Sequence, residues 1–197
     1  MVKIVITGGI ACGKTLFCKY LSRLGFEILD CDHVVHSLEA CEGDAVAAVA
    51  QEFGQEFILG DGSVNRKKLG QLVFNDKKLR SRLNAIVHPL VEDRVEKWLS
   101  DTHQGIPVVV IPLLYELGWE KCYDCVVAVV CERMLQLKRL IEKRSCSEQE
   151  AESRLMSQLP LSIKTARADI VVVNNGSVLA LRKEAERVER LLKMRYV

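Results

Sequence analysis

The sequence has no apolar run long enough to cross a membrane, and it has almost no net charge. Its longest apolar stretches, at 107–114 and 125–131, are far shorter than the roughly 20 residues of a membrane helix. With 28 Lys and Arg against 26 Asp and Glu, the overall charge gives no reason to expect a nucleic-acid partner. The chain also begins without a signal-peptide pattern. We therefore expect a cytoplasmic protein without membrane or nucleic-acid partners, either a monomer or a weak homo-oligomer.

Paired metal-binding cysteines are also missing, although the chain has eight cysteines. Cys122 and Cys125 form the one C-x-x-C, and no second pair stands at zinc-ribbon spacing. The segment around Cys18 and the one from Cys125 to Cys131 are mostly apolar. We expect free, mostly buried thiols with a structural role in a reducing compartment, rather than a metal site or a redox pair.

Five short segments lack the polar–apolar alternation of a half-exposed strand. They are VKIVIT (2–7), FEILD (26–30), PVVVI (107–111), CVVAVV (125–130) and DIVVVN (169–174). Continuous apolar strands are typical of a parallel sheet covered on both faces. A helical pattern at 14–24 ends at Gly25, and a second one closes the chain with an apolar stripe of Leu181, Ala185, Val188 and Leu192. The alternation predicts an α/β fold with a doubly wound, five-stranded parallel sheet.

Residues 8–15, GGIACGKT, match the phosphate-loop pattern G-x-x-x-x-G-K-[ST] between a predicted strand and a predicted helix. The glycines let backbone N–H groups point inward, and the helix N-terminus adds partial positive charge. Lys14 is expected to reach the β- and γ-phosphates of a nucleotide, and Thr15 to bind Mg²⁺. A plain glycine-rich turn would leave Lys14 without a purpose. We therefore predict a P-loop NTPase fold.

The motifs of switch GTPases are missing. No aspartate is followed by a glycine three residues later, and NDKK at 75–78 is not the guanine-binding motif. The sequence therefore favours ATP.

Asp30 and Asp32 follow the second predicted strand, at the sheet edge where ligands bind in open parallel sheets. In an extended segment both side chains would point the same way. Phosphoryl transfer needs a carboxylate to accept a hydroxyl proton or to help hold Mg²⁺. Asp32 is our candidate, whereas Asp30 is explained as well by a turn or a helix cap. Pro112 stands where a Walker-B aspartate is usual, which leaves Thr15, phosphate oxygens and water to hold the metal, with Asp32 as a further candidate ligand. Glu116 is either a supporting acid or a surface carboxylate.

Two intervals between strands are too long for simple crossovers and have mainly helical patterns. We expect one domain over 1–197, with a core of 1–31, 107–137 and 166–197, a helical acceptor-binding subdomain over 32–106, and a helical lid over 138–165. Ser147 and Glu150 predict a capping box that starts a helix within the lid. The arginines around this lid are Arg133, Arg139, Arg144 and Arg154, of which we expect Arg133 to be solvated. A lid excludes water, which favours a kinase over an ATPase.

Six segments, in order and over almost the whole chain, closely resemble the dephospho-CoA kinase family. They are TGGIACGKT (7–15), LDCD (29–32), NRKKLGQLVF with LNAIVHP (65–74 and 83–89), IPLLYELG (111–118), RLMSQ (154–158) and KTARADIVVVNNGS (164–177). They resemble, respectively, the family's phosphate loop, its D-A-D segment, its substrate subdomain, its P-L-L-[FY]-E motif, its lid and its last strand. One such loop would indicate any P-loop kinase, but six segments in order are highly specific.

The resemblance implies transfer of the γ-phosphoryl group of ATP to the ribose 3′-hydroxyl of dephospho-CoA, with Mg²⁺. It implies that Asp32 takes the hydroxyl proton, that Lys14 and Arg139 neutralise the moving phosphoryl group, and that Thr7 positions it. The residues implied for ATP binding are Gly8, Ala11, Cys12, Gly13, Lys14, Thr15, Leu16, Arg144, Asn175 and Gly176. Those implied for the acceptor are Asp32, His88, Leu113, Glu116, Arg154 and Gln158. Without the family, His88 before Pro89 would be interpreted as a helix-end histidine.

Four residues depart from the family pattern. Ala11 replaces a loop glycine, Cys12 a serine, Leu16 a hydroxyl residue, and Cys31 a small alanine. We expect a negative φ at Ala11, because a positive φ would strain a residue that has a Cβ. Two rival functions stay open: a kinase for another small acceptor such as a nucleoside monophosphate, and a nucleotide-gated binding protein without turnover.

Overall fold

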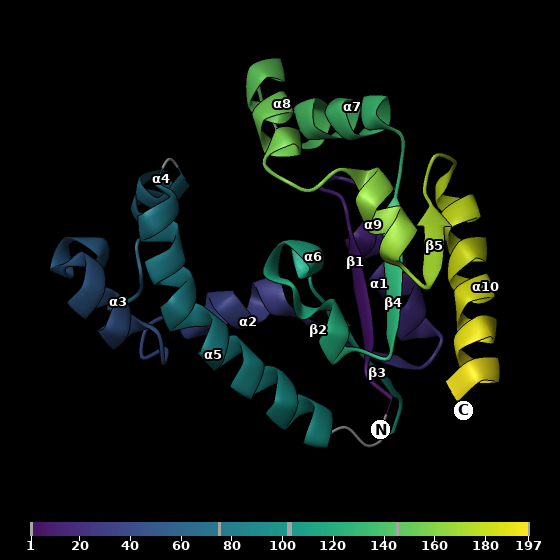
Figure 1. Ribbon diagram of the computed structural model, residues 1–197, viewed down its shortest axis with the longest axis horizontal. Coiled ribbons are helices and arrows are strands. Elements are labelled where there is room, and N and C mark those ends of the chain that lie inside the picture. The colour runs from purple at the N-terminus through teal and green to yellow at the C-terminus, as the bar shows by residue number, and fades with distance from the viewer. Residues whose placement is uncertain (1, 75, 102–103, 145, 197) are drawn as a thin grey trace. The chain divides into compact units, whose positions relative to one another are not determined.

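The computed structural model describes residues 2–74, 76–101, 104–144 and 146–196 (Figure 1). The chain forms two compact units. The first comprises Met1–Ile28 with His103–Val197, and the second comprises Leu29–Thr102. Within the described residues, no helix is long and apolar enough to span a bilayer.

A five-stranded sheet is the centre of the first unit. Its strands are β1 (Ile4–Gly8), β2 (Phe26–Asp30), β3 (Ile106–Val110), β4 (Cys125–Val130) and β5 (Ile170–Val173). The strand order is β2-β3-β1-β4-β5, and β1 pairs in parallel with β3 and β4, as β4 does with β5. Every residue of β1 and β4 is buried, as their apolar sequences require. The predicted doubly wound α/β fold is confirmed, and each strand lies within two residues of its predicted position.

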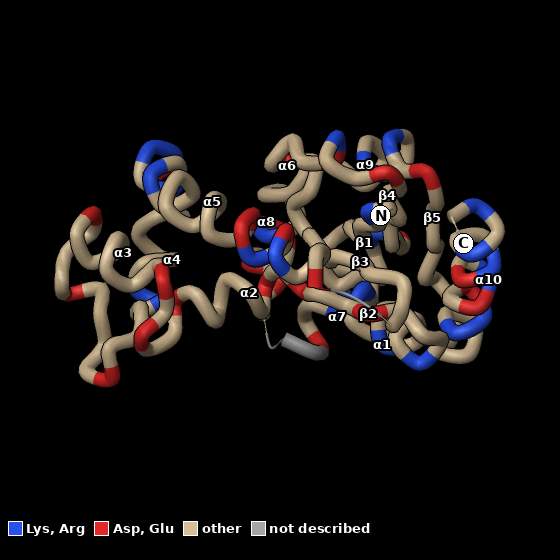
Figure 2. The backbone as a smooth tube through the Cα atoms, turned by 90° about the horizontal axis from the view of Figure 1, so that it is seen from below, with Lys and Arg blue, Asp and Glu red and all other residues tan. Residues whose placement is uncertain are grey.

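Helices cover both faces of this sheet. In Figures 1 and 2, α1 (Lys14–Arg23) lies on one face, and α6 (Leu114–Leu117) and α9 (Leu161–Arg167) lie on the other. The last helix, α10 (Val178–Tyr196), packs against α1 and buries the predicted apolar stripe. Gly25, with φ 91°, ends the first helix as predicted.

Three helices follow β4 and lead to β5. They are α7 (Arg133–Arg144), α8 (Glu148–Met156) and α9. The predicted capping box at the start of α8 is confirmed: the Ser147 side chain accepts from the Glu150 N–H, and the Glu150 carboxylate accepts from the Ser147 N–H.

The second unit is helical, as its sequence pattern predicted. It contains α2 (Cys31–Leu38), α3 (Val46–Phe53), a short 3₁₀ helix (Gln55–Phe57), α4 (Arg66–Phe74) and α5 (Lys77–Asp101). The turn-rich segment at 59–65 is closed by an antiparallel bridge between Ile58 and Val64. Helix α5 packs against α2, α3 and α4, and Pro89 lies in its interior. The binding roles assigned to residues 32–106 and 138–165 stay predictions.

Candidate active site

Two glycines allow the phosphate loop (residues 8–15) to turn between β1 and α1. Gly8 has φ 141°, and a Cβ there would lie 1.9 Å from the Val129 carbonyl oxygen. Gly13 has φ 93°, and a Cβ there would lie 2.3 Å from Asn174 Nδ2. Any larger residue would combine a strained backbone with a steric clash at either position. The motif therefore needs glycine at these two positions because the loop packs closely on β4 and on the end of β5.

Ala11, between these glycines, has φ 58°, so the expectation of a negative φ was wrong. The left-handed conformation costs a residue with a Cβ about 1–2 kcal/mol. The Ala11 methyl group recovers part of this cost, because it packs with Ile10 against Leu140, Cys146 and Ala151 of the α7–α8 region. The loop tip is thus anchored to the helices that follow β4.

Lys14 and Thr15 begin α1, where backbone N–H groups and the helix dipole favour an anion. The Lys14 ammonium donates to the carbonyl oxygens of Gly8 (3.2 Å) and Gly9 (2.8 Å), so it lies over the loop. Thr15 is exposed, whereas Leu16 packs against the core between the sheet and α1. The loop therefore presents a cation and a hydroxyl group at one helix end.

The backbone of Ile10 is held on both sides by glutamine side chains. Gln136 Nε2 donates to the Ile10 carbonyl oxygen (2.8 Å), and the Ile10 N–H donates to Gln158 Oε1 (2.9 Å). Gln158, implied as an acceptor-site residue, is thus in contact with the phosphate loop. Gln136 is almost fully buried, and sequence reasoning missed it. The sequence feature that could have identified Gln136 is its uncharged polar side chain on the helix that also carries Arg139.

Arg139 and Asn174 hold the next residues of the loop. The Arg139 guanidinium donates to the carbonyl oxygens of Ala11 (3.3 Å) and Asn174 (3.0 Å). Asn174 Nδ2 in turn donates to the Cys12 carbonyl oxygen (2.8 Å). The structure therefore brings Arg139 to the loop, and its role in neutralising the phosphoryl group stays a prediction. Asn174 was not among the predicted site residues, although its neighbours Asn175 and Gly176 were.

Cys12 forms a close thiol pair with Cys131, the residue after β4. The Cys131 thiol donates to Cys12 Sγ (3.5 Å), and both side chains are buried. This hydrogen bond and the charge of Lys14 lower the pKa of Cys12 to about 7, against the opposing effect of burial. The same hydrogen bond, together with burial, raises the pKa of Cys131. All eight cysteines are free thiols, and six of them are buried.

Asn175 and Gly176, which were predicted to bind ATP, follow β5. Asn175 accepts from the Glu132 N–H (2.8 Å) and donates to its carboxylate (2.8 Å), which ties this turn to the start of α7. Gly176 is exposed beside it.

The end of β3 carries the segment that replaces a Walker-B aspartate. The Thr7 hydroxyl, fully buried, donates to the Pro112 carbonyl oxygen (3.3 Å), and Leu113 is 41% exposed. The Glu116 carboxylate is paired with Lys164 (2.7 Å) and accepts from the Leu159 N–H (2.9 Å). Glu116 is therefore not the surface carboxylate that the sequence left open.

Asp30 and Asp32 belong to the second unit, at the start of α2. Asp30 is the N-cap, and its carboxylate accepts from the Asp32 N–H (3.0 Å), which confirms the capping interpretation. The helix begins at Cys31, so the assumption of an extended segment was wrong, and the exposed Asp32 lies in the first helical turn. Burial, reinforced by the two carboxylates, raises the pKa of Cys31 to about 12 and keeps it a thiol.

His88 lies in the interior of α5, so the helix-end interpretation was wrong. It is half-buried, and burial lowers its pKa, while the charge of Glu92 acts in the opposite direction. A neutral imidazole at physiological pH follows from this environment.

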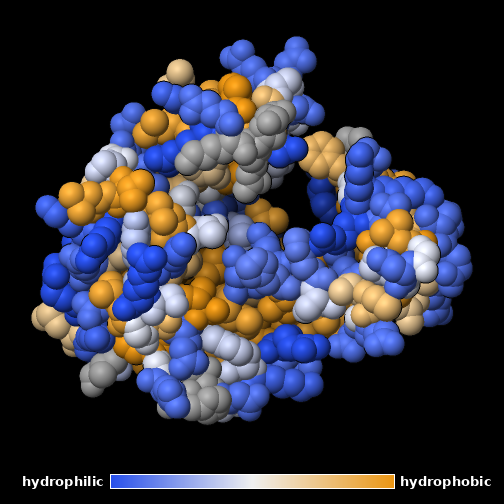
Figure 3. Space-filling view, turned by 180° about the vertical axis from the view of Figure 1, so that it is seen from behind, coloured by the Kyte–Doolittle hydropathy of each residue, from blue (hydrophilic) through white to orange (hydrophobic). Residues whose placement is uncertain are grey.

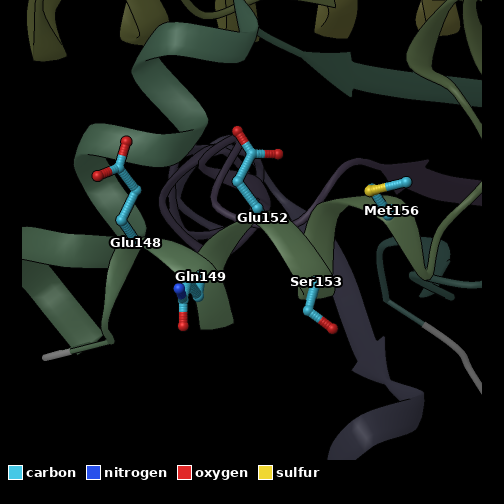
Figure 4. Close-up of a pocket in the computed structure, with 5 residues that line it drawn as sticks. All are labelled: Glu148, Gln149, Glu152, Ser153 and Met156. Carbon is cyan, nitrogen blue, oxygen red and sulfur yellow. The ribbon is translucent and has the colours of Figure 1, made fainter.

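The arginines of the lid region differ in their surroundings. Arg133 is 57% exposed and pairs with Glu152, as expected for a solvated residue, and Arg154 is exposed on α8. Arg144 ends α7, and its side chain lies outside the described residues. A surface hollow nearby is lined by Glu148, Gln149, Glu152, Ser153 and Met156, all from α8. Figure 4 shows Glu148 and Glu152 on one side of this helix and Gln149 and Ser153 on the other.

A family model described as dephospho-CoA kinase matches residues 2–180. The chain belongs to the dephospho-CoA kinase family. A relative of that name from Nostoc sp. is 36% identical and covers 92% of this chain and 93% of its own length. Another, from Shouchella clausii, is 38% identical and covers 89% and 90%. The resemblance is confirmed, and membership of this family makes the protein an ATP-dependent kinase.

Solved structures agree with the family. A crystal structure of a Thermus thermophilus protein has a TM-score of 0.85 at 29% identity and covers 97% of both chains. A dephospho-CoA kinase from Campylobacter jejuni has a TM-score of 0.64 at 26% identity and covers 96% of both. A shikimate kinase from Acinetobacter baumannii, at 16% identity and a TM-score of 0.58, shares the fold.

Proposed function

We propose that this dephospho-CoA kinase family member transfers the γ-phosphoryl group of ATP to the 3′-hydroxyl of dephospho-CoA by means of Lys14, Arg139, Thr7 and Asp32. The loop braced on both sides of Ile10 supports this proposal most directly, because transfer of a phosphoryl group depends mainly on positioning and charge neutralisation. Lys14 supplies the charge at the loop, and Arg139 supplies a guanidinium beside it. Thr7 positions the phosphoryl group from the end of β1.

Asp32 is proposed to take the proton of the 3′-hydroxyl. It is exposed in the first turn of α2, and Asp30 fixes the start of this helix. His88, Leu113, Arg154 and Gln158 are proposed for the acceptor side. Asn175, Gly176 and Arg144 are proposed for the nucleotide side.

Mg²⁺ is proposed to arrive with ATP. Among the described residues, no group of three or more His, Cys, Asp and Glu side chains could hold a metal by itself. Mg²⁺ keeps several waters and commonly takes one or two protein ligands together with substrate phosphates. The exposed Thr15 fits that donor set, with Asp32 as a second ligand. When bound, the metal would neutralise phosphate charge.

The decisive test is mass-spectrometric detection of CoA from dephospho-CoA and ATP. A panel of nucleoside monophosphates in place of dephospho-CoA tests the rival kinase function. ATP binding without any phosphorylated product would instead support a binding protein.

Asp32→Asn is expected to retain ATP affinity while kcat falls about 10²–10⁴-fold, the range for a positioned acid or base. Asp30→Asn is a matched control, because Asp30 and Asp32 flank Cys31 and the substitution is chemically the same. Asparagine caps helices as well as aspartate does, so this variant should stay within about threefold of wild type. Equal turnover of wild type and Asp32→Asn would remove Asp32 from the mechanism.

A further inference from the structure

Two motifs that are distant in the sequence meet in a buried ion pair. Lys164 comes from KTARAD at the end of the helical interval, and Glu116 comes from IPLLYELG after β3. Lys164 Nζ lies 2.7 Å from Glu116 Oε1, with the lysine side chain 0% exposed and the glutamate 17% exposed. A fully buried lysine is rare in proteins unless it is paired. Neither Lys164 nor this pairing has a part in the mechanism described above.

The lysine end of the pair reaches the base of the phosphate loop. Besides Glu116, Lys164 Nζ donates to the Pro112 carbonyl oxygen (3.2 Å). The same oxygen accepts from the Thr7 hydroxyl (3.3 Å), at the end of β1. One carbonyl group thus joins the buried cation to the strand from which the loop departs.

The glutamate end of the pair reaches the chain that returns from α8 to α9. Glu116 Oε1 also accepts from the Leu159 N–H (2.9 Å). The neighbouring residue, Gln158, accepts from the Ile10 N–H within the phosphate loop (2.9 Å). The ion pair is therefore linked to two of the loop's supports, to Thr7 of its strand through Pro112 and to Gln158 through the adjacent Leu159.

Stability alone does not explain this arrangement. Removing two charges from water is costly, and apolar replacements of buried ion pairs are often neutral or stabilising. The second carboxylate oxygen, Glu116 Oε2, is buried and has no hydrogen-bond partner among the described residues. Because this oxygen is removed from water without gaining a hydrogen bond, its burial costs free energy of folding.

We propose that Lys164 and Glu116 are a positioning pair for phosphoryl transfer. They fix the positions of the Thr7 hydroxyl and of Gln158 relative to the phosphate loop. Neither residue need touch the substrate, because the effect passes through Pro112 and Leu159. This inference rests on the proposed function and assigns Glu116 a role through its neighbours.

The test separates positioning from stability by removing one charge and then both. Lys164→Met and Glu116→Gln each leave a buried charge unpaired and should lower Tm. The double variant removes both charges and should recover Tm to within a few degrees of wild type. If the pair positions the site, kcat of the double variant should still be about 10–100-fold below wild type, with KM for ATP changed less than about threefold. A purely structural pair would restore kcat together with Tm, and that result would overturn the proposal.

Two further measurements complete the design. The exposed pair Arg182–Glu186 on α10 (3.2 Å) is the control, and Arg182→Met with Glu186→Gln should leave kcat within about twofold of wild type. Should the double variant fail to fold, Glu116→Gln assayed below its own Tm takes its place, and kcat within twofold of wild type would overturn the proposal. Wild type that forms no CoA would count against the proposed function, whereas an equally active double variant would count against the pair alone.

Discussion

At the scale of single residues, the phosphate loop shows which positions need glycine and which tolerate a methyl group. Gly8, Ala11 and Gly13 all have a positive φ. At the two glycines a Cβ would also collide with a neighbour, whereas the Ala11 methyl group packs against the α7–α8 helices. The cost of the left-handed conformation at Ala11 is therefore partly offset by about 0.8 kcal/mol of burial.

This difference predicts opposite responses to single changes in the loop. Gly13→Ala should lower stability by about 2 kcal/mol or more, because it adds backbone strain to a contact of 2.3 Å with Asn174 Nδ2. Ala11→Gly should change stability by less than about 1 kcal/mol, because relieved strain is balanced by lost packing and by a more flexible unfolded chain. Denaturant unfolding of both variants checks this. A large loss of stability in Ala11→Gly would show that the methyl packing outweighs the strain.

The lowered pKa of Cys12 predicts that nucleotide binding depends on pH. Because this pKa is about 7, raising the pH from 6 to 8 should convert the buried thiol to a thiolate within the loop. The thiolate repels the nucleotide phosphates, so binding should weaken as the pH rises. We expect the Kd for ATP to increase by about threefold to tenfold, which corresponds to an electrostatic cost of roughly 1 kcal/mol.

Cys12→Ser is the control, because serine does not ionise in this range and ATP's own titration is common to both proteins. Isothermal titration calorimetry at pH 6, 7 and 8 measures the effect. Parallel profiles for wild type and Cys12→Ser would show that Cys12 stays protonated.

At the scale of elements, α7 and α8 form a short helical assembly whose stability depends on local signals. Helix α8 has only nine residues, and its start is fixed by the Ser147–Glu150 capping box. The loop tip packs against a small buried cluster, which consists of Leu140 from α7, Ala151 from α8 and Cys146, which lies between the two helices in sequence. A change that destabilises α8 should therefore also loosen the phosphate loop.

Ser147→Ala should cost about 1 kcal/mol, the usual effect of losing an N-cap. Amide hydrogens in the first turns of α8 should exchange about fivefold faster, and kcat should fall several-fold because the cluster that anchors the loop tip forms less often. Hydrogen exchange followed by mass spectrometry measures the first effect. Ser153→Ala, in the same helix but away from the cap, should leave exchange nearly unchanged. If the α8 amides exchange equally fast in the two variants, the capping box does not determine the stability of this helix.

At the scale of the whole molecule, charges of the two signs are nearly balanced. Figure 2 shows basic and acidic residues interspersed along α10, and Figure 3 shows one face on which some apolar residues are scattered among hydrophilic ones and others lie together near its middle. Scattered apolar residues are normal on a monomer surface. The monomeric or weakly associating state stays a prediction.

ATP with Mg²⁺ should stabilise the whole first unit through the loop. At a ligand concentration of 100 times Kd, binding adds about 2.7 kcal/mol. For a chain of this size, that corresponds to a rise in Tm of about 5–10 °C. Lys14→Ala should lose most of this rise, because the charge over the loop is gone. An undiminished rise in Lys14→Ala, measured by differential scanning calorimetry, would contradict the assignment of the loop.

Much of the fold was predictable because its signals are local. The five strands are continuous apolar segments, the glycine spacing defines the loop, and Ser147–Glu150 is a contact between neighbours in sequence. Family membership also followed from segments in order along the chain. These features depend on a few adjacent residues, so they can be recognised without knowing what lies across the fold.

The contacts that hold the candidate site were decided by tertiary structure. Asn174 Nδ2 reaches the Cys12 carbonyl over 162 residues, Gln136 reaches Ile10 over 126, and Lys164 finds Glu116 because α9 and α6 share one face of the sheet. The order β2-β3-β1-β4-β5 brings these residues together, and no pattern within a single segment records that order. The positive φ of Ala11 has the same origin, because the path of the loop is set by β4, β5 and the helices around it. Sequence by itself thus determined the elements and the chemistry of the loop, and long-range packing determined which side chains support it.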